Sequence, residues 1–128
     1  MPTMQTVKWG VLSVSGHFRL RVQIPVRDSD IVEMASIASR SKERAAAAAE
    51  EFGIEGSYGS YEELLADKAI QAVYIPLPNH MHAEWVRKAA DAGKHILCEK
   101  PFSLNADETA AAIDYARAKG VKVMEAFM

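Results

Sequence analysis

The chain has 128 residues, of which 49% are hydrophobic and 25% are charged, a composition that excludes a mostly disordered or fibrous protein. Its formal net charge is -2, so no basic excess points to a nucleic-acid or anionic-membrane partner. The single cysteine, Cys98, excludes an internal disulfide and a cysteine-rich zinc site. Residues 1–10 lack the apolar core of a secretory leader, and no apolar stretch is long enough to cross a bilayer. A cytoplasmic location is therefore expected.

Short β-rich runs alternate with helical patterns along the chain. In chain order the sequence predicts strand Val7–Leu12, helix His17–Asp28 with Pro25 as its end or kink, strand Ile31–Ser39, helix Ser41–Phe52, a short strand within Gly56–Gly59, a helix opened by the Ser60 and Glu63 capping box, strand Ala72–Leu77, helix Met81–Ala92, strand His95–Cys98, a helix from Asn105 to about Lys119, and strand Val121–Met124. This alternation is typical of βαβ units. It predicts a Rossmann-like, doubly wound α/β fold with a mainly parallel sheet and helices on both faces.

The turn after the first strand is where a doubly wound fold holds the pyrophosphate of a dinucleotide. Small residues are needed there, so that backbone N–H groups and a helix N-terminus can approach the phosphates. The sequence has Ser13-Val14-Ser15-Gly16 at this place, which is small but lacks the G-x-G-x-x-G pattern. On this motif alone, a phosphate-binding turn and a purely structural turn both stay open.

The end of the second predicted strand bears on the choice of cofactor. An acidic residue at this place bonds the ribose 2′-hydroxyl of NAD, but here the sequence is Ser39-Arg40-Ser41-Lys42. A guanidinium and a hydroxyl suit an adenosine 2′-phosphate, because this phosphate needs cationic donors and an acid would repel it. The segment therefore favours NADP. The alternative is a pair of solvated cations at a helix start, with Ser41 as the N-cap.

Two further segments follow predicted strands, at the edge where parallel sheets bind ligands. In Pro78–His82 (PNHMH), Asn79 could cap the helix or bond a ribose, and the histidines lack the spacing and partners of a zinc site, so no metal is expected. The segment Glu99-Lys100-Pro101 follows the next strand. Lys100 could donate a hydrogen bond or proton to a reacting carbonyl, or form a weak surface salt bridge with Glu99.

Six segments, in order along nearly the whole chain, together carry a family pattern. They are Val7–Leu12 (VKWGVL), Ile37–Lys42 (IASRSK), Tyr58–Leu65 (YGSYEELL), Ala72–His82 (AVYIPLPNHMH), Gly93–Pro101 (GKHILCEKP) and Met124–Met128 (MEAFM). In these segments the chain resembles the N-terminal half of the Gfo/Idh/MocA oxidoreductases, the glucose-fructose oxidoreductase-like family. The branch it looks most similar to contains dihydrodiol dehydrogenase and 1,5-anhydrofructose reductase.

The resemblance implies a Rossmann domain that binds NADP or NAD. By this match the phosphate turn would be lined by Ser13, Val14, Ser15, Gly16 and His17, the adenosine 2′-phosphate would meet Ser39 and Arg40, and the ribose crevice would be bordered by Leu77, Pro78, Asn79 and His82. Glu99, Lys100 and Pro101 match the family's EKP motif, whose lysine is the expected catalytic residue at the nicotinamide. The chain departs from the family in this turn. The usual pattern is G-x-G or G-x-A, and here serine occupies both glycine positions, as Ser13 and Ser15.

Together these features predict the cofactor-binding half of an NADP-preferring oxidoreductase that transfers hydride to or from a sugar- or diol-type alcohol or ketone. Family members are longer, with a C-terminal substrate and dimerisation domain after the segment matching Glu125–Met128. Residues 1–128 are thus expected to form one dinucleotide-binding domain that lacks this partner and binds cofactor without turnover. The full-length family takes a small-molecule substrate and can form homo-oligomers. The alternative, motivated by the serine-substituted turn, is a non-catalytic nucleotide-binding or protein-interaction module.

Overall fold

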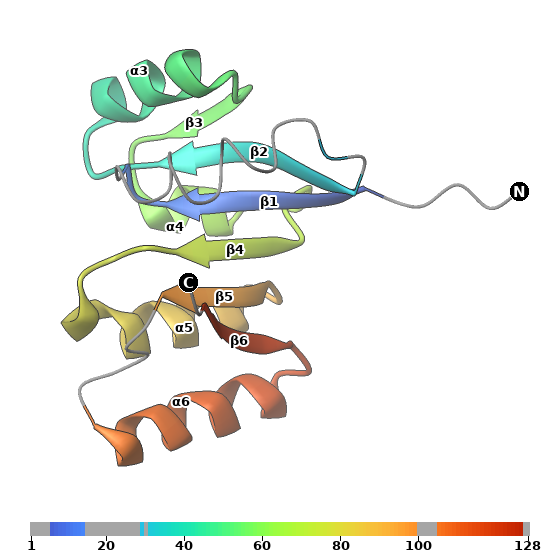
Figure 1. Ribbon diagram of the computed structural model, residues 1–128, viewed down its shortest axis with the longest axis vertical. Helices are drawn as coiled ribbons and strands as arrows, with labels where there is room; N and C mark the ends of the chain where they lie inside the picture. Colours follow the sequence, from blue (N-terminus) through green and yellow to red (C-terminus); the bar gives the residue numbers. More distant parts are fainter. Residues whose placement is uncertain (1–5, 15–28, 30, 100–104, 127–128) are drawn as a thin grey trace, which may run out of the picture.

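A single parallel sheet organises the computed structural model, which describes residues 6–14, 29, 31–99 and 105–126 (Figure 1). Its strands are β1 Val7–Leu12, β2 Val32–Ala38, β3 Gly56–Tyr58, β4 Ala72–Ile75, β5 His95–Glu99 and β6 Val123–Ala126. They lie in the order β3-β2-β1-β4-β5-β6, and every neighbouring pair is parallel. Strands β2 and β3 are therefore added on one side of β1, and the last three strands on its other side. The order of strands changes direction between β1 and β4. Ligands of doubly wound folds bind at this switch point, outside the carboxyl ends of the strands.

The described helices are α3 Lys42–Phe52, α4 Tyr61–Leu65, the short 3₁₀ helix η2 Asn79–Met81, α5 His82–Asp91 and α6 Ala106–Ala118. Three of them, α3, α4 and α6, begin where the sequence supplies a capping side chain. The side chains of Ser41, Ser60 and Asn105 each accept a hydrogen bond from the backbone N–H three residues later. This confirms Ser60 and Asn105 as the helix N-caps of the two predicted capping boxes. The predicted helix over 17–28 lies outside the described residues.

The helices cover both faces of the sheet, because successive strand residues point to opposite sides. On one face Val11, Ile37 and Tyr74 pack with the alanines of α3. On the other face Leu12 and neighbouring strand residues pack with α4, α5 and α6. The doubly wound α/β fold predicted from the sequence is thus confirmed.

Helix α3 packs through small side chains. Its buried residues are Ala45, Ala48 and Ala49, each no more than 6% exposed. The alanine run therefore provides helix propensity and also brings the helix backbone close to β2 and β3. Gly53 ends the helix with a φ of 70°.

On the opposite face, β1 is approached closely by α4. A Cβ atom added to Gly10 would lie 2.5 Å from a methyl carbon of Leu64, which is fully buried. The β1–β2 register also shifts between Trp9 and Gly10. Glycine inside this strand is therefore explained by the space that Leu64 occupies.

At the amino edge of the sheet, Lys94 holds two loops together. Its side chain is 5% exposed, and its Nζ donates hydrogen bonds of 2.6 Å to the backbone carbonyls of Asp67 and Ile70. Burial lowers the pKa of this lysine, and the carboxylate of Asp67 partly opposes that shift. The turn after α5 is thereby fixed to the loop that leads into β4.

Several predicted strand ends were wrong by one or two residues, and two of them have identifiable reasons. The strand predicted over Ala72–Leu77 ends at Ile75, because Pro76 has no backbone N–H for the ladder. The strand predicted over Val121–Met124 begins at Val123, because the N–H of Val121 bonds the carbonyl of Ala116 at the end of α6. Among the described residues, no helix has the length and hydropathy needed to cross a membrane.

Candidate functional site

A cavity of about 530 Å³ opens where β1, β2 and β4 end. The chain segments that follow these three strands form much of its wall, and α3, α4 and η2 contribute the rest. The lining residues are Ser13, Val14, Ser39, Arg40, Ser41, Arg44, Tyr61, Leu77, Pro78 and Met81. The arrowheads of these strands point to the same side of the molecule in Figure 1. The cavity thus lies at the edge of the sheet that the fold uses for ligands.

The structure brings together residues that the sequence analysis named separately. The cavity contains Ser13 and Val14 from the predicted phosphate turn, Ser39 and Arg40 from the predicted 2′-phosphate segment, and Leu77 and Pro78 from the predicted ribose crevice. The remaining turn residues, Ser15, Gly16 and His17, lie outside the described residues. The same is true of Lys100 and Pro101, and of the side chain of Asn79.

One wall of the cavity is cationic and rich in hydroxyl groups. Arg40 and Arg44 are both exposed. Ser39 accepts a hydrogen bond of 3.2 Å from the backbone N–H of Ser41, and Ser41 accepts one of 3.2 Å from the N–H of Arg44 at the start of α3. None of the described lining residues is acidic, although the Ser41 hydroxyl donates to Glu43 at 3.3 Å. This wall is chemically suited to an anion.

Another part of the lining is mainly apolar. Tyr61 is 6% exposed, and its ring meets that of Trp85 edge-on, with centroids 5.1 Å apart and an interplanar angle of 87°. Leu77 and Met81 complete this wall. The combination of an apolar surface and a cationic rim suits a ligand with an aromatic ring and a phosphate group.

Sequence reasoning missed Arg44, Tyr61 and Met81. A usable signal existed for two of them. The N-cap at Ser41 places Arg44 in the first turn of α3, beside the end of β2. The N-cap at Ser60 likewise places Tyr61 at the start of α4. No comparable signal pointed to Met81.

Ser13 adopts a backbone conformation that favours glycine. Its φ is 137°, a value at which a Cβ atom is strained. The family's phosphate turn has glycine at the matching position. The chain therefore keeps a glycine-like backbone there with serine as the side chain.

His82 does not line the cavity. It is fully buried, and its Nε2 lies 2.5 Å from the carbonyl oxygen of Leu77. A carbonyl oxygen can only accept, so Nε2 carries the proton and donates it to this bond. The buried imidazole of His82 thus holds the backbone of Leu77 in place through this hydrogen bond. The resemblance implied instead that the side chain of His82 borders the ribose crevice.

Glu99 ends β5 and is half-buried. Its carboxylate accepts a hydrogen bond from the hydroxyl of Tyr74, which is fully buried in β4. Burial of the phenol raises the pKa of Tyr74, and this hydrogen bond and the negative charge of Glu99 raise it further. The pair lies at the carboxyl ends of β4 and β5 and does not line the cavity described above.

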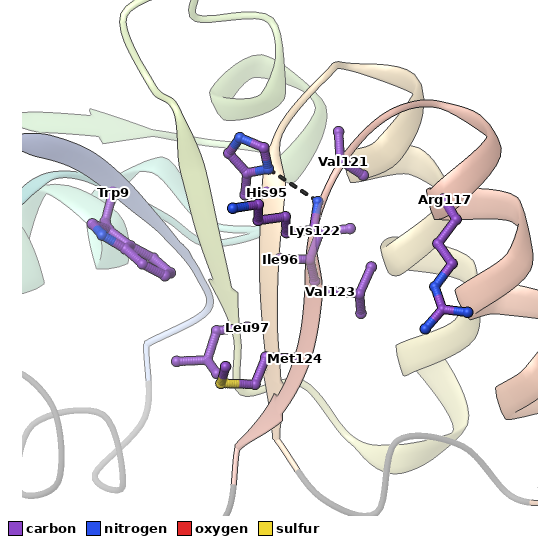
Figure 2. A pocket seen from close by; sticks show the side chains of 9 residues that line it. All are labelled: Trp9, His95, Ile96, Leu97, Arg117, Val121, Lys122, Val123 and Met124. Atoms are coloured by element: carbon purple, nitrogen blue, oxygen red, sulfur yellow. Dashed lines mark hydrogen bonds between the residues drawn. The ribbon is translucent and has the colours of Figure 1, made fainter.

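A second hollow, of about 680 Å³, lies at the β5–β6 edge of the sheet. Figure 2 shows Trp9, Leu97 and Met124 on one side of these strands and Arg117, from α6, on the other. His95 also lines it, but its Nδ1 already accepts a 3.0 Å hydrogen bond from the N–H of Lys122. This hollow is mainly apolar, and no hydroxyl side chain accompanies the guanidinium of Arg117 there, so it is a weaker candidate for a nucleotide site.

The strand order and the cavity at the switch point define a dinucleotide-binding Rossmann domain. A sequence profile described as an oxidoreductase family with an NAD-binding Rossmann fold matches residues 7–127. The chain therefore belongs to this Gfo/Idh/MocA family, as its sequence motifs predicted. Among the described residues, no group of three or more histidine, cysteine or acidic side chains is arranged to hold a metal ion.

Comparison with known proteins agrees with this assignment. The chain is 54% identical over 120 residues to D-xylose 1-dehydrogenase (NADP(+)) 2 of Haloferax volcanii, a match covering 94% of this chain and 37% of the relative. It is 37% identical to trans-1,2-dihydrobenzene-1,2-diol dehydrogenase of Xenopus tropicalis, with coverage of 94% and 37%. The crystal structure of KijD10, a 3-ketoreductase from Actinomadura kijaniata in complex with NADP and TDP-benzene, superimposes with a TM-score of 0.89 at 34% identity, over 94% of this chain and 37% of that one. The chain thus spans little more than a third of the length of these relatives.

Proposed function

We propose that this chain is the cofactor-binding domain of an NADP-preferring oxidoreductase that acts on a sugar- or diol-type alcohol or ketone. The observation that carries the proposal is the convergence of Arg40, Arg44, Ser39 and Ser41 on one wall of the cavity at the switch point. In this interpretation that wall receives the adenosine 2′-phosphate. The apolar wall formed by Tyr61, Leu77 and Met81 would receive the adenine ring.

The charges of the site favour NADP over NAD. An NAD site places a carboxylate at the end of the second strand, where it bonds the ribose 2′-hydroxyl. Here that place holds Ser39 and Arg40, and the second cation, Arg44, lines the same cavity. Two guanidinium groups and the hydroxyl of Ser39 can donate to a phosphate dianion, whereas the 2′-hydroxyl of NAD would leave both cations without an anionic partner.

The remaining predicted residues have roles at the reacting end of the cofactor. When bound, the nicotinamide supplies or accepts the hydride. Lys100, matched to the family's EKP motif, would orient and polarise the substrate oxygen, and would hold or release its proton. Ser13 and Val14 would border the pyrophosphate, where the family's turn binds it.

The names of the relatives support a small polyol-like substrate, since they include a xylose dehydrogenase and a dihydrodiol dehydrogenase. In the longer relatives the substrate pocket would come from the part of the protein that this chain does not match. We therefore propose that the 128-residue chain binds cofactor but does not turn over a sugar or diol. Appreciable dehydrogenase activity of the purified chain would contradict this proposal.

Calorimetric titration with NADPH and, separately, NADH tests the proposed site. NADPH should bind more tightly than NADH. Arg40→Ala should weaken NADPH by about 1.5–3 kcal/mol, the usual range for a hydrogen bond to a charged group, and should leave NADH nearly unchanged. Lys42→Ala is the matched control, because it removes an exposed cation two residues away that does not line the cavity.

The outcomes separate the candidate functions. Loss of the NADPH preference in Arg40→Ala but not in Lys42→Ala supports the proposed 2′-phosphate site. Equal affinities of the unmodified chain for both cofactors would refute the NADP preference. Failure to bind either cofactor would refute cofactor binding by this chain and favour a protein-interaction module.

A further inference from the structure

The hydroxyl of Tyr74 in β4 donates a hydrogen bond to the carboxylate of Glu99 at the end of β5. Tyr74 pairs in register with Leu97 of the neighbouring strand β5, and Glu99 lies two residues further along. Side chains two residues apart on a strand share a face, so the phenol reaches along β5 to the carboxylate. Both groups lie on the face of the sheet that α3 also covers, beside Val11 and Ile37.

A structural role for Tyr74 would not by itself require a carboxylate. A buried phenol needs one hydrogen-bond acceptor, and a backbone carbonyl or a neutral side chain would satisfy it. Glu99 instead contributes a half-buried charge, whose partial removal from water is unfavourable unless it is hydrogen-bonded. The phenol provides such a bond, and an ionised carboxylate is purely an acceptor. The pair therefore holds one negative charge in a fixed position at the end of β5.

The position of this charge relates it to the cofactor. A doubly wound sheet of this strand order is built from two mononucleotide-binding halves. The cationic cavity with Arg40 and Arg44 lies beside β1 and β2, which belong to the first half. Glu99 ends β5, in the second half. If the adenosine nucleotide occupies the first half, as proposed above, the nicotinamide nucleotide occupies the half that contains Glu99.

We propose that Tyr74 is a positioning residue that fixes the Glu99 carboxylate, and that this pair sets the balance between binding of the oxidised and the reduced cofactor. This inference rests on the proposed function. The oxidised nicotinamide ring carries a positive charge and the reduced ring is neutral, so a fixed negative charge in this half attracts the oxidised form selectively. Tyr74 itself touches neither substrate nor cofactor in this proposal.

The test measures the dissociation constants of NADP⁺ and NADPH for the 128-residue chain, Tyr74→Phe, Glu99→Gln and the double variant. Glu99→Gln should weaken NADP⁺ relative to NADPH by about three- to tenfold, as expected for a partly screened charge. Tyr74→Phe should shift the ratio in the same direction by a smaller factor, because the charge stays but is no longer held. The double variant should shift it no further than Glu99→Gln, since Tyr74 acts through Glu99.

Tyr115→Phe is the matched control. Its hydroxyl also donates to a carboxylate, that of Asp91 at 2.5 Å. However, both residues lie near the C-terminal ends of α6 and α5, which run back to the amino edge of the sheet. This variant should leave the NADP⁺ to NADPH ratio unchanged, which separates a positional effect on the cofactor from general loss of a tyrosine–carboxylate bond.

Each outcome supports or overturns the proposal. An unchanged ratio in Tyr74→Phe, with cofactor still bound, overturns the role of Tyr74 and leaves the proposed function intact. Failure of the unmodified chain to bind either form overturns both. If Tyr74→Phe does not fold, Glu99→Asp takes its place, because it keeps the charge but withdraws it from the phenol. That variant should give the same intermediate shift, and an unchanged ratio would again overturn the proposal.

Discussion

Replacing Ser13 by glycine should stabilise the protein. A non-glycine residue at a φ of 137° is expected to cost about 1–3 kcal/mol. Glycine removes this strain but adds about 0.5–1 kcal/mol of conformational entropy loss on folding. The net gain is about 1 kcal/mol, which for a chain of this size raises the melting temperature by roughly 3–5 °C.

The assay is urea and thermal unfolding of Ser13→Gly beside Ser13→Ala. Alanine removes the same hydroxyl but keeps the Cβ atom, so it should give no such gain. If the two variants have the same stability, or if glycine destabilises the protein, then the backbone at Ser13 is not strained and the reasoning fails. Because glycine keeps the same backbone path, NADPH affinity should change less than about threefold, well under 1 kcal/mol.

Four further predictions follow from the packing and the charges. Lys94→Met should destabilise the protein by about 2–4 kcal/mol in urea unfolding, because one buried and one partly buried carbonyl lose a charged donor, and a loss below about 0.5 kcal/mol would contradict this. Gly10→Ala should cost about 1–3 kcal/mol, since its methyl group would overlap a leucine side chain of α4; unchanged stability would show that the helix moves freely. Cys98 is fully buried and burial raises the pKa of its thiol, so a thiol reagent at pH 8 should label it only on unfolding, and rapid labelling of the native protein would refute its burial. The hydroxyl of Tyr58 donates a 2.6 Å hydrogen bond to Asp67 and lowers the pKa of that carboxyl. The stability that this bond contributes is present above about pH 4, the pKa of the carboxyl in the unfolded chain, and is lost as the pH falls through its lower pKa in the folded protein. Tyr58→Phe should therefore lose less stability than the unmodified protein when urea midpoints at neutral and acidic pH are compared, and equal losses would contradict this assignment.

Much of the fold could be predicted from the sequence because local signals agreed with the global pattern. The capping residues Ser60 and Asn105 located two helix starts, and Gly53 located a helix end. Strand ends were less accurate, since they depend on which neighbour supplies each hydrogen bond. Val121 shows this, because its N–H bonds the end of α6 and not the sheet.

The candidate site was only partly predictable. Arg40 and Leu77 each lie two residues beyond the end of a strand. The fold brings the carboxyl ends of the parallel strands to one edge, so order along the chain was enough to group them. Tyr61 lines the cavity because α4 packs across the sheet near β1 and β2, a contact between distant segments. For a related reason, sequence position shows that His82 follows a strand, but not that its imidazole is fully buried and hydrogen-bonded to the carbonyl of Leu77.

The alanine face of α3 determines more than helix stability. The N-terminal end of this helix carries Ser41 and Arg44 into the cavity wall, and Ala45, Ala48 and Ala49 set how far the helix axis stands from the sheet. A bulkier residue at any of these three positions would move the axis of α3 away from the sheet. The guanidinium of Arg44 would then lie farther from the segments that follow β1 and β4. The width of the cavity thus depends on methyl groups that face away from any ligand, and the selectivity of the site could change through substitutions that never contact a cofactor.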